Sequence, residues 1–199
     1  MNASKAYTLF AGVNGAGKST LYKLLNLDFG VRINLDEIIK ARFNGYWNDS
    51  AIQTEAGRIA VRLIKDCIDN GKSFNQETTL TGLSILTTIK KAKNRGFKIN
   101  LYYVGLENVE LSINRVATRV RAGGHGIPID VLRRRYEQSF ENLKTILPFC
   151  DSVSIYDNSG LNAVDALKPL LVIANSRIAL WDEKCPQYLK RVLDDFIIN

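Results

Sequence analysis

Residues 12–19 carry the feature that most constrains the fold, a phosphate-binding loop of the pattern G-x-x-x-x-G-K-[ST]. Its glycines allow the backbone to curl so that several amide groups point at one anion. Lys18 can reach the β and γ phosphates of a nucleotide, and the Ser19 hydroxyl is of the type that binds Mg²⁺. Such a loop needs a buried strand before it and a helix after it, and residues 7–11 and 19–25 have the apolar patterns of these two elements.

The pattern therefore predicts a nucleotide site. We expect it to be formed by Gly12, Asn14, Gly15, Ala16, Gly17, Lys18, Ser19 and Thr20, with Ser19 also as the metal-binding residue. The positive dipole end of the following helix would point at the same anion. The alternative is a flexible glycine-rich turn without a ligand, which leaves the four matched residue types and their flanking strand and helix without a reason.

The composition is that of a globular chain with one hydrophobic core. The chain has 199 residues, 46% of them hydrophobic, which suits a single domain. No run of about eighteen apolar residues occurs and the N-terminal residues lack the apolar stretch of a signal peptide, so we expect a cytoplasmic protein without a membrane partner. The 3 cysteines lie far apart, and no histidine or cysteine stands at a zinc-binding spacing from them.

The net charge of +7 is concentrated in one segment. Residues 111–136 contain a group of arginines and a single acidic residue, Asp130. These arginines are Arg115, Arg119, Arg121, Arg133, Arg134 and Arg135. A basic segment suits either a nucleic acid or a polyanionic small molecule. Single-strand binders interleave aromatic side chains with their basic residues, and only Tyr136 does so here, so we interpret the segment as a phosphate clamp and consider a nucleic-acid partner less probable than a nucleotide.

A second strand is expected over residues 29–35, an apolar and β-branched run that ends at Asp36. In open α/β sheets ligands bind at the carboxyl ends of the strands, so the topology places Asp36 near the phosphates. Its carboxylate is then a candidate catalytic group. The alternative is that Asp36 only caps the helix that follows.

A third strand is expected over residues 73–79, and its end carries more polar groups than a buried strand needs for packing. Glu77, Thr78 and Thr79 are therefore candidate substrate-binding residues. The alternative is an ordinary strand end followed by a helix whose N-cap is Thr79 or Thr81.

Residues 108–136 have the pattern of a mobile lid made of two helices. Asn108 is an N-cap signal, and Arg115 and Arg119 follow on one helical face, where like charges repel unless an anion bridges them. The glycine-rich loop at 123–128 has the composition of a hinge and ends in a proline that can open the next helix.

Two further features of the lid carry candidate residues. Arg133, Arg134 and Arg135 lie at the start of a helix, where positive charge is unfavourable unless something anionic offsets it. His125 in the loop is a proton carrier, a polar contact or simply an exposed residue.

The rest of the chain continues the alternation of strands and helices. The other expected elements are helices over 50–68 and 83–95, strands over 97–104 and 151–158, and a hairpin with a terminal helix over about 169–199. Ser50 and Gln53 have the spacing of a capping box for the first of these helices, whose apolar stripe predicts core packing. Asn158, at the end of the last parallel strand, is placed to approach a nucleotide base.

These elements predict an α/β protein with the P-loop nucleoside triphosphate hydrolase and kinase fold. We expect a mostly parallel sheet with helices on both faces and an arginine-rich helical lid. No linker or repeat divides the chain, so we expect one P-loop kinase domain over residues 1–199, with the lid at about 108–136. Phosphoryl transfer from ATP with Mg²⁺ fits these parts, with Lys18 on the donor phosphates and Asp36 as the proton acceptor.

A series of motifs in this order resembles the zeta toxin family of P-loop kinases. The motifs are the loop at 12–20, Asn34-Leu35-Asp36-Glu37-Ile38, Glu77-Thr78-Thr79-Leu80, Arg115-Val116 with Arg119-Val120, Gly123-Gly124-His125, Arg134-Arg135-Tyr136 and Tyr156-Asp157-Asn158-Ser159. The similarity spans about residues 7–160 and is greater to the compact bacterial relatives than to the founding plasmid toxin.

The resemblance implies that ATP phosphorylates the amino sugar of UDP-N-acetylglucosamine and that a small antitoxin protein restrains the enzyme. It further implies that Asp36 is the base, that Glu77 and nearby residues contact the sugar nucleotide, and that Arg119 and Arg135 serve the transferred phosphate. Two alternatives stay open: a kinase for another metabolite hydroxyl, on a sugar or a nucleoside, and a nucleotide-regulated module that binds RNA or DNA through the lid arginines.

Overall fold

The computed structural model describes residues 5–47, 49–82, 84–160, 167–174 and 177–197. The strands are β1 (Ala6–Gly12), β2 (Val31–Ile33), β3 (Phe74–Thr78), β4 (Lys98–Gly105), β5 (Ser152–Asp157), β6 (Lys168–Ala174) and β7 (Arg177–Trp181). The helices are α1 (Lys18–Leu25), α2 (Leu35–Phe43), α3 (Ser50–Asp69), α4 (Ser84–Asn94), α5 (Val109–Arg121), α6 (Ile129–Ile146), η1 (Leu147–Phe149) and α7 (Gln187–Ile197). Residue 83, the expected start of a helix, and residues 175–176, at the expected hairpin turn, lie outside the described residues.

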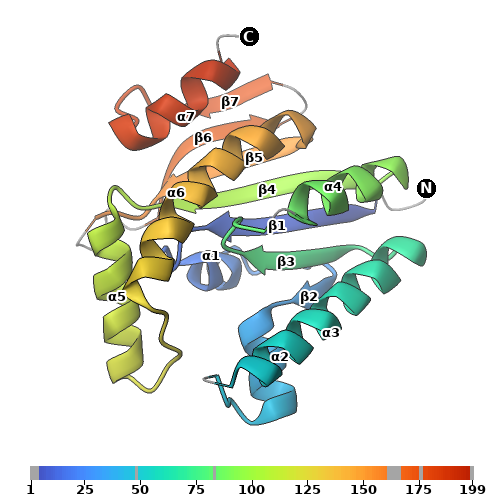
Figure 1. Cartoon of the computed structure of the whole chain (residues 1–199). Helices are drawn as coiled ribbons and strands as arrows, with labels where there is room; N and C mark the ends of the chain where they lie inside the picture. The colour runs from blue at the N-terminus through green and yellow to red at the C-terminus, as the bar shows by residue number, and fades with distance from the viewer. Residues whose placement is uncertain (1–4, 48, 83, 161–166, 175–176, 198–199) are drawn as a thin grey trace.

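The described strands form a 7-stranded sheet of order β2-β3-β1-β4-β5-β6-β7 (Figure 1). In the order of the sheet, β2, β3, β1, β4 and β5 pair in parallel. β6 pairs antiparallel with β5, and β7 pairs antiparallel with β6. This arrangement confirms the predicted α/β fold with a mostly parallel sheet. The central strand is β1, so the loop that follows it opens at the middle of the carboxyl edge, where ligands of such sheets bind.

Alternate residues of the central strands pack against helices on opposite faces of the sheet, as the two-residue period of a strand requires. On one face Leu9 and Leu101 belong to a large core cluster with residues of α3, α4, α6 and α7. On the other face Phe10 stacks on Tyr102 with ring centroids 5.1 Å apart, and Tyr22 of α1 meets Phe10 edge-on. In Figure 1 the helices α3, α4 and α6 accordingly lie in front of the sheet and α1 lies behind it.

Two expected helix starts differ in the structure. β2 ends at Ile33, and Asn34 caps α2 by accepting hydrogen bonds from two backbone amides of its first turn. Asp49, rather than the expected capping box of Ser50 and Gln53, caps α3 by accepting from the amides of Ala51 and Ile52. Asparagine and aspartate accept such amide bonds as well as serine does, so the spacing of a capping box did not identify the cap.

The helices of the described residues are short or polar by the standards of membrane spans. None of them is long and apolar enough to cross a bilayer.

Candidate active site

The loop between β1 and α1 has the shape of an anion cradle because its glycines adopt angles that other residues avoid. Gly12 and Gly17 have φ angles of 138° and 97°. A Cβ atom on Gly12 would lie 2.1 Å from the carbonyl oxygen of Val104, and one on Gly17 would lie 2.6 Å from the side-chain nitrogen of Asn158. Both positions therefore favour glycine for conformation, and Gly12 also requires it for space because it faces a backbone carbonyl.

Lys18 is folded into this loop. Its side-chain nitrogen donates hydrogen bonds to the carbonyl oxygens of Gly12, at 3.0 Å, and Val13, at 2.9 Å. Burial lowers the pKa of Lys18, while the carboxylates of Glu77 and Asp36 act in the opposite direction. The Lys18 ammonium is therefore a buried cation, and a polyphosphate that enters the site can bind to it.

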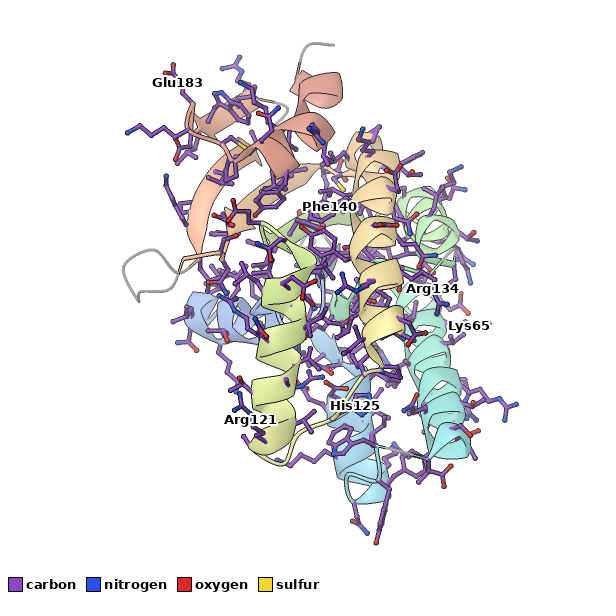
Figure 2. All side chains as sticks on the ribbon, turned by 60° about the vertical axis from the view of Figure 1, so that its left-hand side comes forward. Lys65, Arg121, His125, Arg134, Phe140 and Glu183 are labelled. Atoms are coloured by element: carbon purple, nitrogen blue, oxygen red, sulfur yellow. The ribbon has the colours of Figure 1, made fainter. Side chains whose placement is uncertain are left out.

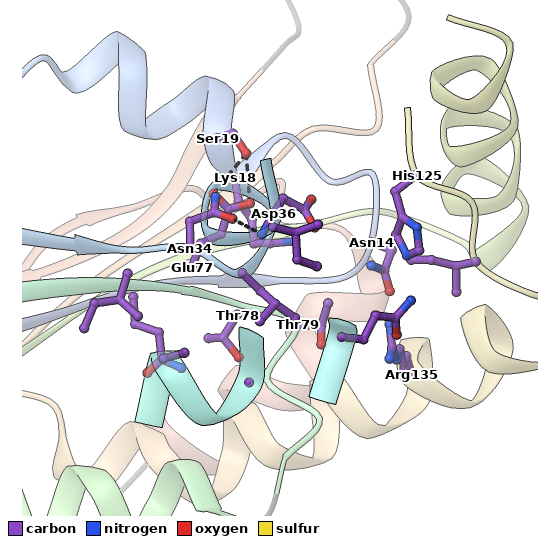
Figure 3. A pocket seen from close by; sticks show the side chains of 18 of the residues that line it. Asn14, Lys18, Ser19, Asn34, Asp36, Glu77, Thr78, Thr79, His125 and Arg135 are labelled. Atoms are coloured by element: carbon purple, nitrogen blue, oxygen red, sulfur yellow. Dashed lines mark hydrogen bonds between the residues drawn. The ribbon is translucent and has the colours of Figure 1, made fainter. Parts of the chain in front are cut away.

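Ser19 lies against Glu77 at the end of β3. The serine hydroxyl is 2.8 Å and 2.9 Å from the two carboxylate oxygens of Glu77 (Figure 3). The same carboxylate also accepts a hydrogen bond of 2.8 Å from the side-chain amide of Asn34. Glu77, predicted as a substrate-binding residue, thus lies directly beside the predicted metal-binding serine.

Arg32 of the edge strand β2 fixes the Glu77 carboxylate from the other side. Its guanidinium is 2.7 Å from Glu77 and donates a 3.0 Å hydrogen bond to the side-chain oxygen of Asn75. The register places Arg32 opposite Asn75 in the parallel ladder, and the guanidinium lies 3.9 Å from the ring centre of Tyr22. The sequence interpretation missed Arg32, because only the pairing of strands brings it to Glu77.

Asp36 lies in the first turn of α2, after the cap residue Asn34. The alternative that Asp36 only caps the helix is therefore wrong, because the capping oxygen belongs to Asn34. The Asp36 carboxylate lines the cavity at this edge of the sheet, and it opposes the lowering of the pKa values of Lys18 and His125 that burial causes. It is placed where a proton acceptor would be useful.

Thr78 and Thr79 line the same cavity, and their hydroxyl groups also organise the chain locally. The Thr78 hydroxyl accepts a hydrogen bond of 3.0 Å from the amide of Leu80, and Thr79 pairs with the hydroxyl of Thr81 at 3.0 Å. Because α4 begins at Ser84, neither Thr79 nor Thr81 is its N-cap, contrary to the alternative considered from the sequence.

The lid arginines divide into two groups. Arg115, Arg119 and Arg135 line the cavity, whereas Arg121, Arg133 and Arg134 are exposed. Figure 2 shows Arg121 on the outer side of α5 and Arg134 along α6. Arg133 forms an ion pair of 2.7 Å with Glu110. The expectation that an anion offsets all three consecutive arginines is therefore too broad, because only Arg135 of the three reaches the cavity.

Arg115 and Arg119, expected as a pair bridged by an anion, both donate to backbone carbonyls. Arg115 donates to Gly15, at 3.4 Å, and to Asn158, at 2.7 Å. Arg119 donates twice to the carbonyl oxygen of His125, at 3.1 Å and 2.8 Å. Arg119 thereby fixes the lid loop. Burial lowers the pKa of Arg135, and the positive charge of Arg134 lowers it further.

His125 is half-buried in the cavity wall, so the interpretation of this residue as simply exposed is wrong. Its Nδ1 atom and the side-chain oxygen of Asn14 are buried atoms without a hydrogen-bond partner among the described residues. Both residues line the cavity, and Figure 3 labels their side chains there. Buried polar atoms without partners are costly, which makes both of them candidate ligand contacts.

The cavity that joins these side chains has a volume of about 640 Å³, within the range of small-molecule sites. Of the predicted site residues it is lined by Asn14, Gly15, Gly17, Lys18, Ser19, Thr20, Asp36, Glu77, Thr78, Thr79, Arg119 and Arg135. Gly12 and Ala16 of the loop are buried and do not line the cavity. Ala60 and Ile64 of α3 also line it, although their helical stripe predicted core packing alone. An apolar residue on such a stripe gives no signal that distinguishes a core from a cavity wall.

The Asn158 side chain is hydrogen-bonded to two other segments of the chain. Its amide nitrogen donates to the carbonyl oxygen of Ala16 at 2.8 Å, and its amide oxygen accepts from the backbone of Leu167 at 3.2 Å. The side chain therefore ties the end of β5 to the phosphate loop, and its approach to a nucleotide base stays a prediction.

Comparisons with known proteins are consistent with this geometry. A family model described as "Zeta toxin" matches residues 2–165. An uncharacterized protein of Haemophilus influenzae is 38% identical over 127 residues, which are 64% of this chain and 89% of that protein.

Two solved structures show the same fold. A structure from the PezAT chromosomal toxin–antitoxin system of Streptococcus pneumoniae is 19% identical, with a TM-score of 0.62 over 98% of this chain and 84% of that one. A complex of AvrRxo1-ORF1 and AvrRxo1-ORF2 with ATP is 15% identical, with a TM-score of 0.68 over 95% of this chain. This chain spans only 64% of the matched chain of that complex.

Proposed function

The chain belongs to the zeta toxin family, and from this premise we propose that it is an ATP-dependent kinase that phosphorylates a hydroxyl group of a small molecule. The observation that carries the proposal is that Lys18, Asp36 and Arg135 line one cavity at the carboxyl edge of the sheet. Phosphoryl transfer needs a cation for the donor phosphates, a carboxylate that accepts the acceptor's proton, and a second cation for the transferred phosphoryl group.

The donor half of the site is the loop and the start of α1. Backbone amides of the loop and the Lys18 ammonium would bind the β and γ phosphates of ATP. Lys18 now donates to two loop carbonyls, so the phosphates compete with these contacts for its protons. The buried position strengthens the attraction, because charges interact more strongly away from water.

The chemistry of the donor set around Ser19 fits Mg²⁺. Ser19 and Glu77 supply oxygen atoms, which are the ligands that Mg²⁺ prefers. Among the described residues no group of three or more histidine, cysteine or acidic side chains is arranged to hold a metal, which suits an ion bound mainly through nucleotide phosphates. When bound, Mg²⁺ neutralises negative charge on the β and γ phosphate oxygens.

In the proposed reaction the acceptor oxygen forms a bond to the γ phosphorus while the bond from that phosphorus to the bridging oxygen of ATP breaks. The electron pair of the broken bond stays on ADP, and the acceptor proton passes to the Asp36 carboxylate. Arg119 and Arg135 offset the charge on the transferred group. Closing of the lid formed by α5 and α6 would exclude water, which is a competing acceptor.

We propose UDP-N-acetylglucosamine as the acceptor, on the basis of the family to which the chain belongs. Thr78, Thr79 and Glu77 line the cavity, and in this proposal they would contact the acceptor. The lining also includes Ala60 and Ile64 of α3, which suit an acceptor with an apolar face. A different sugar or a nucleoside would keep the chemistry and change only these contacts.

Mass spectrometry of the purified protein incubated with ATP, Mg²⁺ and UDP-N-acetylglucosamine tests both parts of the proposal. A phosphorylated sugar nucleotide together with ADP supports them. Transfer to another compound in a screen of sugars and nucleosides would reject this acceptor and keep the kinase. We also propose a small antitoxin protein as a partner, and failure of any genetically adjacent small protein to bind and inhibit the kinase would reject that part.

A further inference from the structure

A tyrosine of the terminal helix α7 reaches the end of β5. The Tyr188 hydroxyl donates a hydrogen bond of 2.6 Å to a carboxylate oxygen of Asp157. The same oxygen accepts from the backbone amide of Ser159 at 3.0 Å and from the Ser159 hydroxyl. One oxygen therefore gathers three donors, and Tyr188 is the one that comes from outside the turn.

These bonds hold the turn at 157–159 against the neighbouring strand. The Ser159 hydroxyl accepts a hydrogen bond of 2.7 Å from the amide of Glu107, and the amide of Asn158 donates to Gly105 at 3.1 Å. A Cβ atom on Gly105 would lie 2.8 Å from the Tyr188 hydroxyl oxygen, so the ring packs directly on the backbone of β4. The position of the turn thus depends on a side chain of α7.

The turn in turn contacts the phosphate loop. Asn158 donates to the carbonyl oxygen of Ala16 at 2.8 Å and accepts through its own carbonyl from Arg115 at 2.7 Å. Arg115 also donates to Gly15, at 3.4 Å. Tyr188 is therefore hydrogen-bonded to Asp157, and the next residue in the chain, Asn158, is hydrogen-bonded to the loop that would hold the ATP phosphates.

The hydroxyl of Tyr188 is suited to a fixed structural contact. Burial raises its pKa, and the hydrogen bond to the Asp157 carboxylate acts in the same direction, so it remains a donor at any ordinary pH. The family model ends at residue 165, so Tyr188 lies in a part of the chain that this match does not cover.

We propose that Tyr188 is a positioning residue for nucleotide binding, which acts through Asp157 and Asn158 to hold the phosphate loop in its binding conformation. The inference rests on the proposed function, because it requires that the loop binds ATP. Tyr188 itself lies outside the cavity lining and takes no part in the transfer. Its loss would therefore weaken ATP binding while the acceptor site and the reacting groups stay intact.

The test compares Tyr188→Phe with Tyr103→Phe as a matched control. Tyr103 is a buried tyrosine whose hydroxyl pairs with Ser139 at 3.0 Å, and it does not line the cavity. Each variant loses one hydroxyl and keeps the ring, so each should fold and lose a similar, small amount of thermal stability. Isothermal titration with ATP and Mg²⁺ gives the Kd, and steady-state kinetics separate kcat from the KM values of ATP and acceptor.

For Tyr188→Phe we expect an ATP Kd about 5-fold higher than in the wild type, the scale of one hydrogen bond, with kcat and the acceptor KM nearly unchanged. For Tyr103→Phe we expect an unchanged ATP Kd. An unchanged Kd in Tyr188→Phe, or an equal rise in both variants, would overturn the positioning role while the proposed function stands. A wild-type protein that binds no ATP would instead overturn both.

Discussion

Replacing Arg32 with methionine removes one partner of a nearly buried ion pair and leaves a side chain of similar length. The Arg32 and Glu77 side chains are 14% and 15% exposed, and their charged atoms are 2.7 Å apart. The variant also loses the hydrogen bond to Asn75 and the position of the guanidinium over the Tyr22 ring. The Glu77 carboxylate would then keep its negative charge without the positive charge of Arg32 beside it.

The expected cost follows from these contacts. Breaking a buried ion pair by removing one partner costs roughly 3–5 kcal/mol, because the other charge is left without its counter-charge. Glu77 is slightly exposed and keeps its bonds from Ser19 and Asn34, so we expect the lower end, about 3 kcal/mol. The loss should appear as a lower midpoint of urea unfolding at an unchanged m value.

Arg62→Met is a matched control for this measurement. Arg62 also pairs with a glutamate, Glu55, but the two side chains are 68% and 39% exposed. Exposed pairs contribute little, so we expect a loss below about 1 kcal/mol. A loss in Arg32→Met as small as in the control would refute the reasoning. The double variant Arg32→Met with Glu77→Gln should recover part of the lost stability, because it no longer buries a charge without a partner.

Two further predictions concern residues that line the cavity. Asp36→Asn should bind ATP with an unchanged Kd and lower kcat by about 10²-fold or more, the scale of a lost general base, and near-normal turnover in this variant would mean that the carboxylate takes no proton. Burial lowers the pKa of His125 from 6.5; Arg119 and Arg135 lower it further, and Asp36 opposes this change. The folded protein is therefore favoured by the neutral imidazole above pH 6.5, and this contribution to stability is lost as the pH falls through the folded-state pKa. Because the chain has 1 histidine, NMR of an untagged sample should show a single imidazole signal. Its titration midpoint should lie below pH 6.5 and move to a higher pH when ATP binds. A midpoint at or above pH 6.5 without nucleotide would contradict the placement of His125 in the cavity wall.

The local parts of the structure could be predicted from the sequence. The phosphate loop, the strand before it and the helix after it depend on residues that are neighbours in the chain, and the alternation of strands and helices fixed the fold class. The expected ends of the parallel strands also brought Asp36 and Glu77 to the same cavity.

The contacts between distant residues could not be predicted in this way. Arg32 reaches Glu77 only because β2 pairs with β3 in one particular register. Asn158 bonds the phosphate loop and Leu167, two segments that are distant from it in the sequence or lie across a turn, and the sequence did not show these contacts.

The lid shows the same limit on a helix. Successive residues of a helix point about 100° apart, so three consecutive arginines cannot all face one cavity. The sequence gives no register for α6 against the sheet, and only the packed structure selects Arg135 over Arg133 and Arg134.

The most direct test of phosphoryl transfer follows the γ-phosphate of labelled ATP. Wild-type protein and the variants Lys18→Ala and Asp36→Asn are incubated with Mg²⁺ and UDP-N-acetylglucosamine, and in parallel with a pool of sugars and nucleosides. We predict that the wild type moves the label to an acceptor hydroxyl, that Lys18→Ala moves none, and that Asp36→Asn moves it at a much lower rate. A wild-type protein that binds ATP and labels no acceptor in either mixture would contradict the assignment of this cavity as a kinase site.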